Sequence, residues 1–90
     1  MIKKKLLVVS GKVQGVGFRF WMQNLANNNN IRGWVKNRSL GDVEALIIGQ
    51  EKEVNKLIKL CRIGPSSATI QSIQINDYSR DYSKKGFNIF

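Results

Sequence analysis

Two glycines, Gly15 and Gly17, lie between a segment typical of a β-strand and a segment with the periodicity of a helix. Glycine adopts positive φ angles at little cost, so the chain can curl here with several N–H groups pointing inward. Such a curl before a helix binds anions, because free N–H donors and the positive end of the helix dipole converge. Arg19 adds a guanidinium that can hold a phosphate through two hydrogen bonds. Residues 11–19 therefore predict a phosphate-binding loop with its own arginine.

The glycine spacing alone also fits an ordinary turn between a strand and a helix, and this interpretation stays open at this point. No third glycine follows at the spacing of a dinucleotide-binding loop. The Gly-Lys-Ser/Thr sequence of nucleotide phosphate loops is also missing after Gly17. A second group of residues elsewhere in the chain is needed to favour one interpretation.

Two segments have the periodicity of amphipathic helices. In the first, apolar residues recur at steps of three and four from Phe18 to Ala26, and the asparagine run that follows is a stop signal. In the second, the same steps run from Val54 to Cys61, with acidic residues before them and a Gly-Pro pair after them. Both segments therefore predict helices with one buried face.

The other apolar and β-branched segments predict strands at residues 5–13, 31–37, 43–48, 70–75 and 87–90. The resulting order, β-α-β-β-α-β with a short terminal strand, is typical of the ferredoxin-like split β-α-β sandwich. In that α+β fold, two helices pack on one face of an antiparallel sheet. We therefore predict an α+β, ferredoxin-like fold that forms a single domain over residues 1–90.

Cys61 is the single cysteine and the sequence has no histidine, which excludes an internal disulfide and a Cys/His metal site. Cys61 lies on the apolar face of the second helix, so we expect a buried packing residue rather than a nucleophile. Residues 1–9 superficially resemble a signal peptide, but their apolar run is only four residues long. No segment has the length needed to span a bilayer. These features predict a cytoplasmic protein without a membrane partner.

The formal net charge of +9 has two interpretations: an anionic or nucleic-acid partner, or a basic surface that keeps the protein soluble. Ferredoxin-like folds include RNA-binding domains, which stack bases on aromatic side chains of the two central strands. The predicted strands at 5–13 and 43–48 contain no aromatic residue. We therefore expect a small anionic substrate and no nucleic-acid partner.

A second group of residues lies in the predicted hairpin, at 33–37, 41–43 and Gly49. In the split β-α-β fold, the far end of the second strand can lie near the loop that follows the first strand, so Asn37 would face Arg19. An asparagine side chain has a donor, an acceptor and no charge, so it can hold a water molecule beside a phosphoryl group. A carboxylate at the same position would repel the dianion.

With these two motifs in register, the sequence closely resembles the acylphosphatase family. The family signature Gly-x-Val-Gln-Gly-Val-x-Phe-Arg is matched by residues 11–19, and the second signature, which begins Gly-aromatic-Val-Lys-Asn, is matched from residue 33. The resemblance implies hydrolysis of acyl phosphates to a carboxylate and inorganic phosphate. It implies that Arg19 is catalytic and that Asn37 positions the attacking water. The implied phosphate-binding residues are Gln14, Gly15, Val16, Gly17 and Phe18.

The reaction needs little covalent chemistry, because a carboxylate is a good leaving group and no general acid is required to expel it. The absence of histidine agrees with this. We expect no cofactor, no metal and a monomer that acts on a small acyl phosphate, with a phosphate oxygen of the substrate accepting the proton of the water. A degenerate or regulatory domain of the family, or one detached from a larger carbamoyl-phosphate-using protein, is the alternative. The one-domain length and the residues at both catalytic positions, Arg19 and Asn37, favour the active enzyme.

Overall fold

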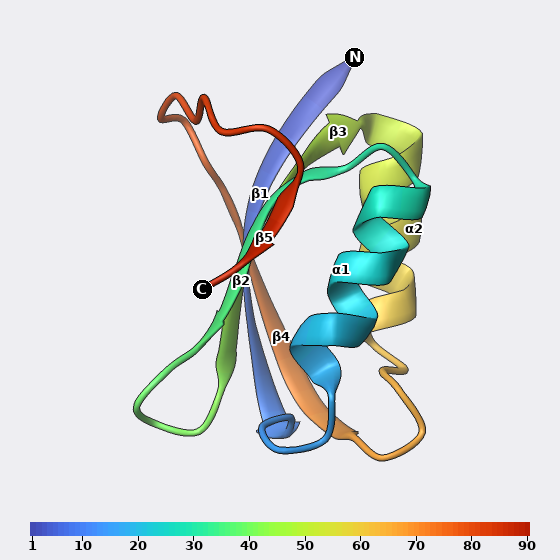
Figure 1. The fold of residues 1–90 in the computed structure, drawn as a ribbon, viewed down its shortest axis with the longest axis vertical. Helices are drawn as coiled ribbons and strands as arrows, with labels where there is room; N and C mark the ends of the chain where they lie inside the picture. The colour runs from blue at the N-terminus through green and yellow to red at the C-terminus, as the bar shows by residue number, and fades with distance from the viewer.

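The computed structural model describes residues 1–90, and its elements follow the predicted order (Figure 1). The strands are β1 (Ile2–Lys12), β2 (Arg32–Asn37), β3 (Val43–Gln50), β4 (Thr69–Asp77) and β5 (Phe87–Ile89), and the helices are α1 (Phe18–Asn28) and α2 (Glu51–Cys61). Neither helix has the length and apolar character needed to cross a membrane.

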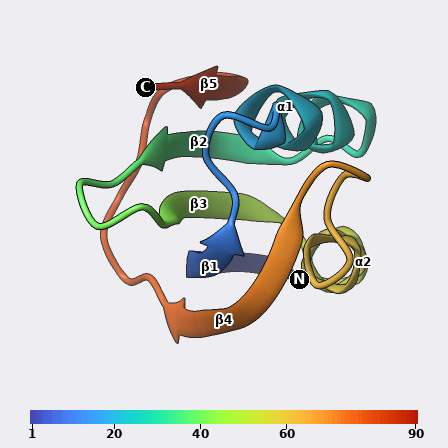
Figure 2. The ribbon, with the colours of Figure 1, turned by 90° about the horizontal axis from the view of Figure 1, so that it is seen from below.

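All five strands form one sheet in the order β4-β1-β3-β2-β5, and both helices lie on the same side of it (Figure 2). Strand β1 pairs antiparallel with β3 and β4, and β2 pairs antiparallel with β3. The predicted ferredoxin-like α+β fold is confirmed. The terminal strand β5 adds a feature that the prediction lacked, because it pairs parallel with β2 at the sheet edge and makes the sheet mixed.

The hydrophobic core lies between the sheet and the two helices. Leu7 and Val9, two residues apart on β1, are fully buried, as expected for side chains that alternate between the two faces of a strand. Phe18 and Met22 of α1 fill the same core. Cys61 is also fully buried there, and burial raises the pKa of its thiol to about 12. The prediction that Cys61 is a packing residue is therefore confirmed.

The observed strands are mostly longer than predicted at their polar ends. Strand β1 begins at Ile2 rather than Lys5, because Lys3 and Lys4 pair with Gly49 and Ile48 of β3. The Lys4 Nζ also donates a hydrogen bond to the main-chain oxygen of Arg80 at 3.0 Å. Pairing with neighbouring strands thus overrides the weak strand preference of lysine.

At one end of the sheet, the connection from β1 to α1 lies beside the turn between β2 and β3 (Figure 1). The Gln14 side chain links the two directly, because its Nε2 donates hydrogen bonds to the main-chain oxygens of Arg38 (2.7 Å) and Asp42 (2.9 Å). This contact brings the two sequence motifs together at one end of the molecule.

Candidate active site

The connection between β1 and α1 curls with its main-chain donors free. Gly15 and Gly17 have φ angles of 74° and 79°, in the left-handed region that glycine adopts without strain. Gly17 is the N-cap of α1 and provides no side-chain cap for the helix. None of the main-chain N–H groups of residues 14–18 donates a hydrogen bond within the protein. The positive end of α1 and these donors therefore create a place where an anion would be stabilised.

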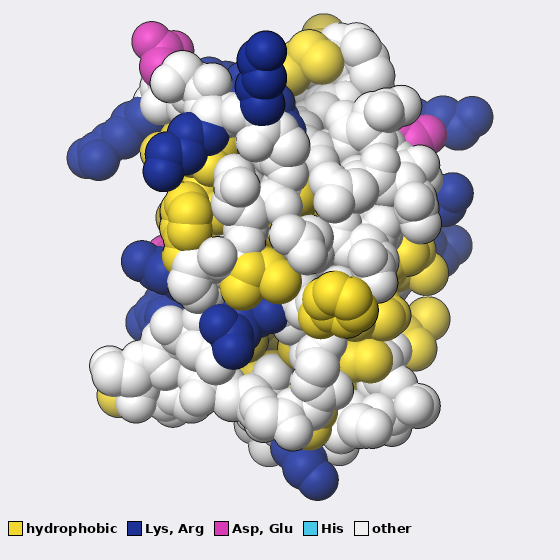
Figure 3. Space-filling model, in the orientation of Figure 1, with side chains coloured by type: hydrophobic (Ala, Val, Ile, Leu, Met, Phe, Trp, Pro, Cys, Tyr) yellow, Lys and Arg dark blue, Asp and Glu magenta, His cyan; other side chains and the backbone are white.

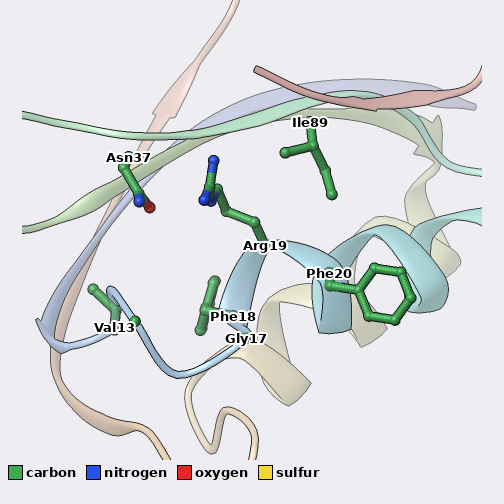
Figure 4. Close-up of a pocket in the computed structure, with 8 residues that line it drawn as sticks. Val13, Gly17, Phe18, Arg19, Phe20, Asn37 and Ile89 are labelled. Atoms are coloured by element: carbon green, nitrogen blue, oxygen red, sulfur yellow. The ribbon is translucent and has the colours of Figure 1, made fainter.

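Arg19 lies in the first turn of α1 and directs its guanidinium across the pocket toward the sheet (Figure 4). Its Nη1 donates a hydrogen bond to the main-chain oxygen of Phe90 at 3.2 Å. The Phe90 ring stacks on Trp34 of β2, with ring centroids 6.1 Å apart. Arg19 is thus held at the sheet edge by one nitrogen, and its other N–H groups stay available for a ligand.

Asn37 is the last residue of β2, where its backbone pairs with Val43 of β3. Its side chain is exposed, makes no hydrogen bond within the protein and lies across the pocket from the glycine curl, beside the Arg19 guanidinium (Figure 4). An amide in this position has one acceptor and two N–H donors free for water or substrate.

One pocket of about 180 Å³ brings most of these residues together. Five predicted site residues line it: Gly15, Gly17, Phe18, Arg19 and Asn37. Two others, Gln14 and Val16, do not. Gln14 uses its side chain to link the curl to the β2–β3 turn, and Val16 packs partly against the core. Their main-chain N–H groups belong to the curl, but their side chains have structural contacts instead.

Three lining residues were not among the predicted site residues: Val13, Phe20 and Ile89. Val13 lies within the predicted loop of residues 11–19, which could have indicated it. Phe20 breaks the helical periodicity of the apolar face of α1, and this is the signal that could have singled it out. Ile89 is brought in by the pairing of β5 with β2, which no local pattern indicates.

The pocket is electropositive. Arg19 is the only charged residue that lines it, and no carboxylate lies among the lining residues. The net charge of +9 is distributed more widely, and basic side chains are scattered over the face shown in Figure 3 rather than gathered in one stripe. No group of three or more His, Cys, Asp or Glu side chains is arranged to hold a metal ion. The available chemistry is therefore hydrogen bonding and positive charge directed at an anion.

We expect Gly17→Ala to weaken binding of inorganic phosphate about tenfold or more, because the new residue shifts donors that would contact an ionised ligand. An added Cβ at Gly17 meets no atom within 4 Å, so the cost is backbone strain at φ 79° and not a clash. The measurement is the phosphate inhibition constant, together with the free energy of unfolding in urea.

Gly86→Ala is the matched control, since Gly86 has a φ of 71°, equally open surroundings and no part in the pocket. Both variants should lose about 1–2 kcal/mol of stability, the strain of a left-handed alanine. Equal effects of both variants on phosphate binding would show that the curl is not a specific anion site.

Comparison with known proteins connects this geometry to one family. Residues 5–89 match the family model described as Acylphosphatase. The acylphosphatase of Acidiphilium cryptum (strain JF-5) is 41% identical over 83 residues, which cover 92% of this chain and 90% of that protein. The crystal structure of acylphosphatase from Bacillus subtilis has a TM-score of 0.92 and 31% identity, and the match covers 100% of this chain and 99% of that one.

A larger protein contains a similar fold. The crystal structure of full-length HypF in the phosphate- and nucleotide-bound form matches the whole of this chain with a TM-score of 0.86 and 28% identity. The matched part is 12% of that longer chain. The same architecture thus occurs both in small acylphosphatases and within a larger protein.

Proposed function

This chain is an enzyme of the acylphosphatase family, and we propose that Arg19 and Asn37 carry out its hydrolysis of acyl phosphates to a carboxylate and inorganic phosphate. The observation that carries the proposal is the convergence of free main-chain donors, one guanidinium and one uncharged amide on a single pocket. These groups come from the β1–α1 connection, the first turn of α1 and the end of β2.

The phosphoryl group binds to the glycine curl and Arg19. Main-chain N–H groups of residues 14–18 donate to its non-bridging oxygens, and Arg19 donates from its remaining nitrogens. Because these donors are fixed by the fold before substrate arrives, they stabilise charge in the transition state without reorganising. Gln14 contributes by holding the curl against the β2–β3 turn, and Val16 contributes through its main chain.

Asn37 positions the attacking water. Its carboxamide oxygen accepts a hydrogen bond from the water, which leaves a water lone pair directed at phosphorus. The new bond forms between the water oxygen and phosphorus, and the bond from phosphorus to the bridging oxygen breaks. The electron pair of that bond leaves with the carboxylate, and a phosphate oxygen accepts the proton of the water. No enzyme base or acid takes part, which agrees with a pocket that has no carboxylate or histidine.

We expect the reaction to need no metal ion, because carboxylates, imidazoles and thiolates, the side chains that usually bind metals, do not line the pocket. Phosphate release from benzoyl phosphate should be the same with and without excess EDTA. Loss of activity in EDTA that Mg²⁺ restores would contradict this. The same assay tests the proposed function itself, since a protein that releases no phosphate above the uncatalysed rate in either condition is not an active acylphosphatase.

A further inference from the structure

Two exposed apolar side chains line one side of the pocket. Phe20 is 63% exposed and Ile89 is 37% exposed, whereas the other apolar lining residues, Val13 and Phe18, are almost fully buried and belong to the core. A phenylalanine ring that is largely exposed to water contributes little to folding. Packing in the core therefore does not account for the position of Phe20 at the pocket.

The geometry of the reaction relates this apolar side of the pocket to the leaving group. In phosphoryl transfer, the attacking and leaving oxygens lie roughly in line on opposite sides of phosphorus. Asn37, which holds the water, lies on one side of the Arg19 guanidinium, and Ile89 and Phe20 lie on the other (Figure 4). A phosphoryl group held by Arg19 and attacked from the Asn37 side therefore directs its leaving carboxylate toward Phe20 and Ile89.

We propose that Phe20 and Ile89 form an apolar wall that binds the acyl group, so that the enzyme prefers acyl phosphates with an aromatic or branched apolar acyl group. The wall rests on the proposed function, because it concerns the same pocket and the same in-line geometry. The lining residues on this side carry no charge and no side-chain hydrogen-bonding group. A charged acyl group finds no partner there, whereas a phenyl ring covers exposed apolar surface on both wall residues.

The test compares benzoyl phosphate with acetyl phosphate, which share the reacting bond and differ in the size of the apolar acyl group. Phe20→Ala should lower kcat/KM for benzoyl phosphate about five- to tenfold, mostly through KM. That loss is smaller than the discrimination of an enclosed apolar pocket, because the wall is open to water. For acetyl phosphate the change should stay below about twofold, since the methyl group is too small to cover the ring. Phe20→Leu should recover most of the benzoyl phosphate activity.

Ile63→Ala is the control for truncation of an exposed apolar side chain, because Ile63 is 73% exposed and does not line the pocket. Ile63→Ala should leave kcat/KM unchanged for both benzoyl phosphate and acetyl phosphate. The inhibition constant of inorganic phosphate should also be the same in Phe20→Ala and wild type, since phosphate lacks an acyl group.

The possible outcomes separate the wall from the proposed function. If wild type hydrolyses both substrates, and Phe20→Ala lowers kcat/KM equally for both or leaves both values unchanged, the wall is wrong while the proposed function stands. If wild type releases phosphate from neither substrate, the proposed function fails and the wall fails with it. A selective loss for benzoyl phosphate, restored by leucine, is the result expected from the proposal.

Discussion

Replacing Arg19 with alanine is expected to lower kcat for acyl phosphate hydrolysis by about 10²–10³-fold or more, the scale for loss of one charge-stabilising donor. Arg19 is the only charged residue that lines the pocket, so no neighbouring side chain can substitute for it. The inhibition constant of inorganic phosphate should rise in the same variant. Steady-state kinetics with benzoyl phosphate measure both effects.

Arg19→Lys separates charge from geometry. Lysine keeps the positive charge but cannot hold two phosphate oxygens with one planar group, so the variant should recover only part of the activity. Arg62→Ala is the matched control, since Arg62 is an exposed arginine at the end of α2 and does not line the pocket. An equal loss in Arg62→Ala would mean that the overall charge of the protein, and not the position of Arg19, is responsible.

The fold should tolerate loss of Arg19. The hydrogen bond from Arg19 to Phe90 is exposed, so its removal should cost no more than about 0.5–1.5 kcal/mol. Thermal unfolding of Arg19→Ala followed by circular dichroism checks this. A variant that unfolds at the assay temperature would leave the kinetic loss to be explained by instability, and the assay would then be repeated at lower temperature.

Asn37→Ala is expected to lower kcat by about 10²-fold while leaving inhibition by inorganic phosphate nearly unchanged. Its carboxamide places the water, and misplacement of a reacting group by about 1 Å costs a factor of this order. The phosphate donors belong to residues 14–19 and remain intact. Comparison of kcat with the phosphate inhibition constant measures the two effects separately.

Two further variants control this prediction. Asn55→Ala removes an exposed asparagine from α2, away from the pocket, and should have no effect on kinetics. Asn37→Asp keeps the size of the side chain but adds a negative charge beside the bound dianion, so it should weaken phosphate inhibition as well as lower kcat. If Asn37→Ala weakened phosphate binding while Arg19→Ala left it unchanged, the assigned roles would be reversed and the mechanism would be wrong.

Sequence patterns were sufficient to predict the order of the elements. They also singled out five of the residues that line the pocket. Helical periodicity in α1 and α2 and alternation in the central strands arise because one face of each element is buried. Such a pattern is visible among residues that are close together in the sequence. The glycine pair required a curl before α1, and the observed φ angles agree with it. The RNA-binding alternative needed aromatic residues on the central strands, and β1 and β3, which are central in the sheet, contain none.

The role of Gln14 could not be predicted, because a sequence motif does not reveal whether a residue acts through its side chain or its main chain. The hydrogen bonds of Gln14 depend on carbonyl groups 24 and 28 residues away. The place of Ile89 in the pocket lining was missed for a similar reason. Ile89 enters the pocket because β5 pairs with β2, and Arg19 reaches Phe90 across 71 residues of sequence. Long-range pairing of this kind leaves no local pattern.

The lysines at the start of β1 were also misjudged. Lys3 and Lys4 have the composition of a solvated terminus, yet the strand continues through them because β3 offers them backbone partners. Lys5 also donates a hydrogen bond to Asp77 of β4, and this contact lowers the pKa of the Asp77 carboxyl below its usual value. Backbone pairing and charge contacts made only in the folded state set the end of this strand.

The two hydrogen bonds of Gln14 also determine how a reactant can enter. They fasten the glycine curl to the hairpin turn, so outward movement of either connection alone would break both bonds. The two bonds therefore restrain the separation between the curl and the end of β2 that carries Asn37. Phe20 of α1 and Ile89 of β5 are exposed residues of the lining, and an acyl phosphate that entered past them would insert its phosphate end first and keep its acyl end at the mouth.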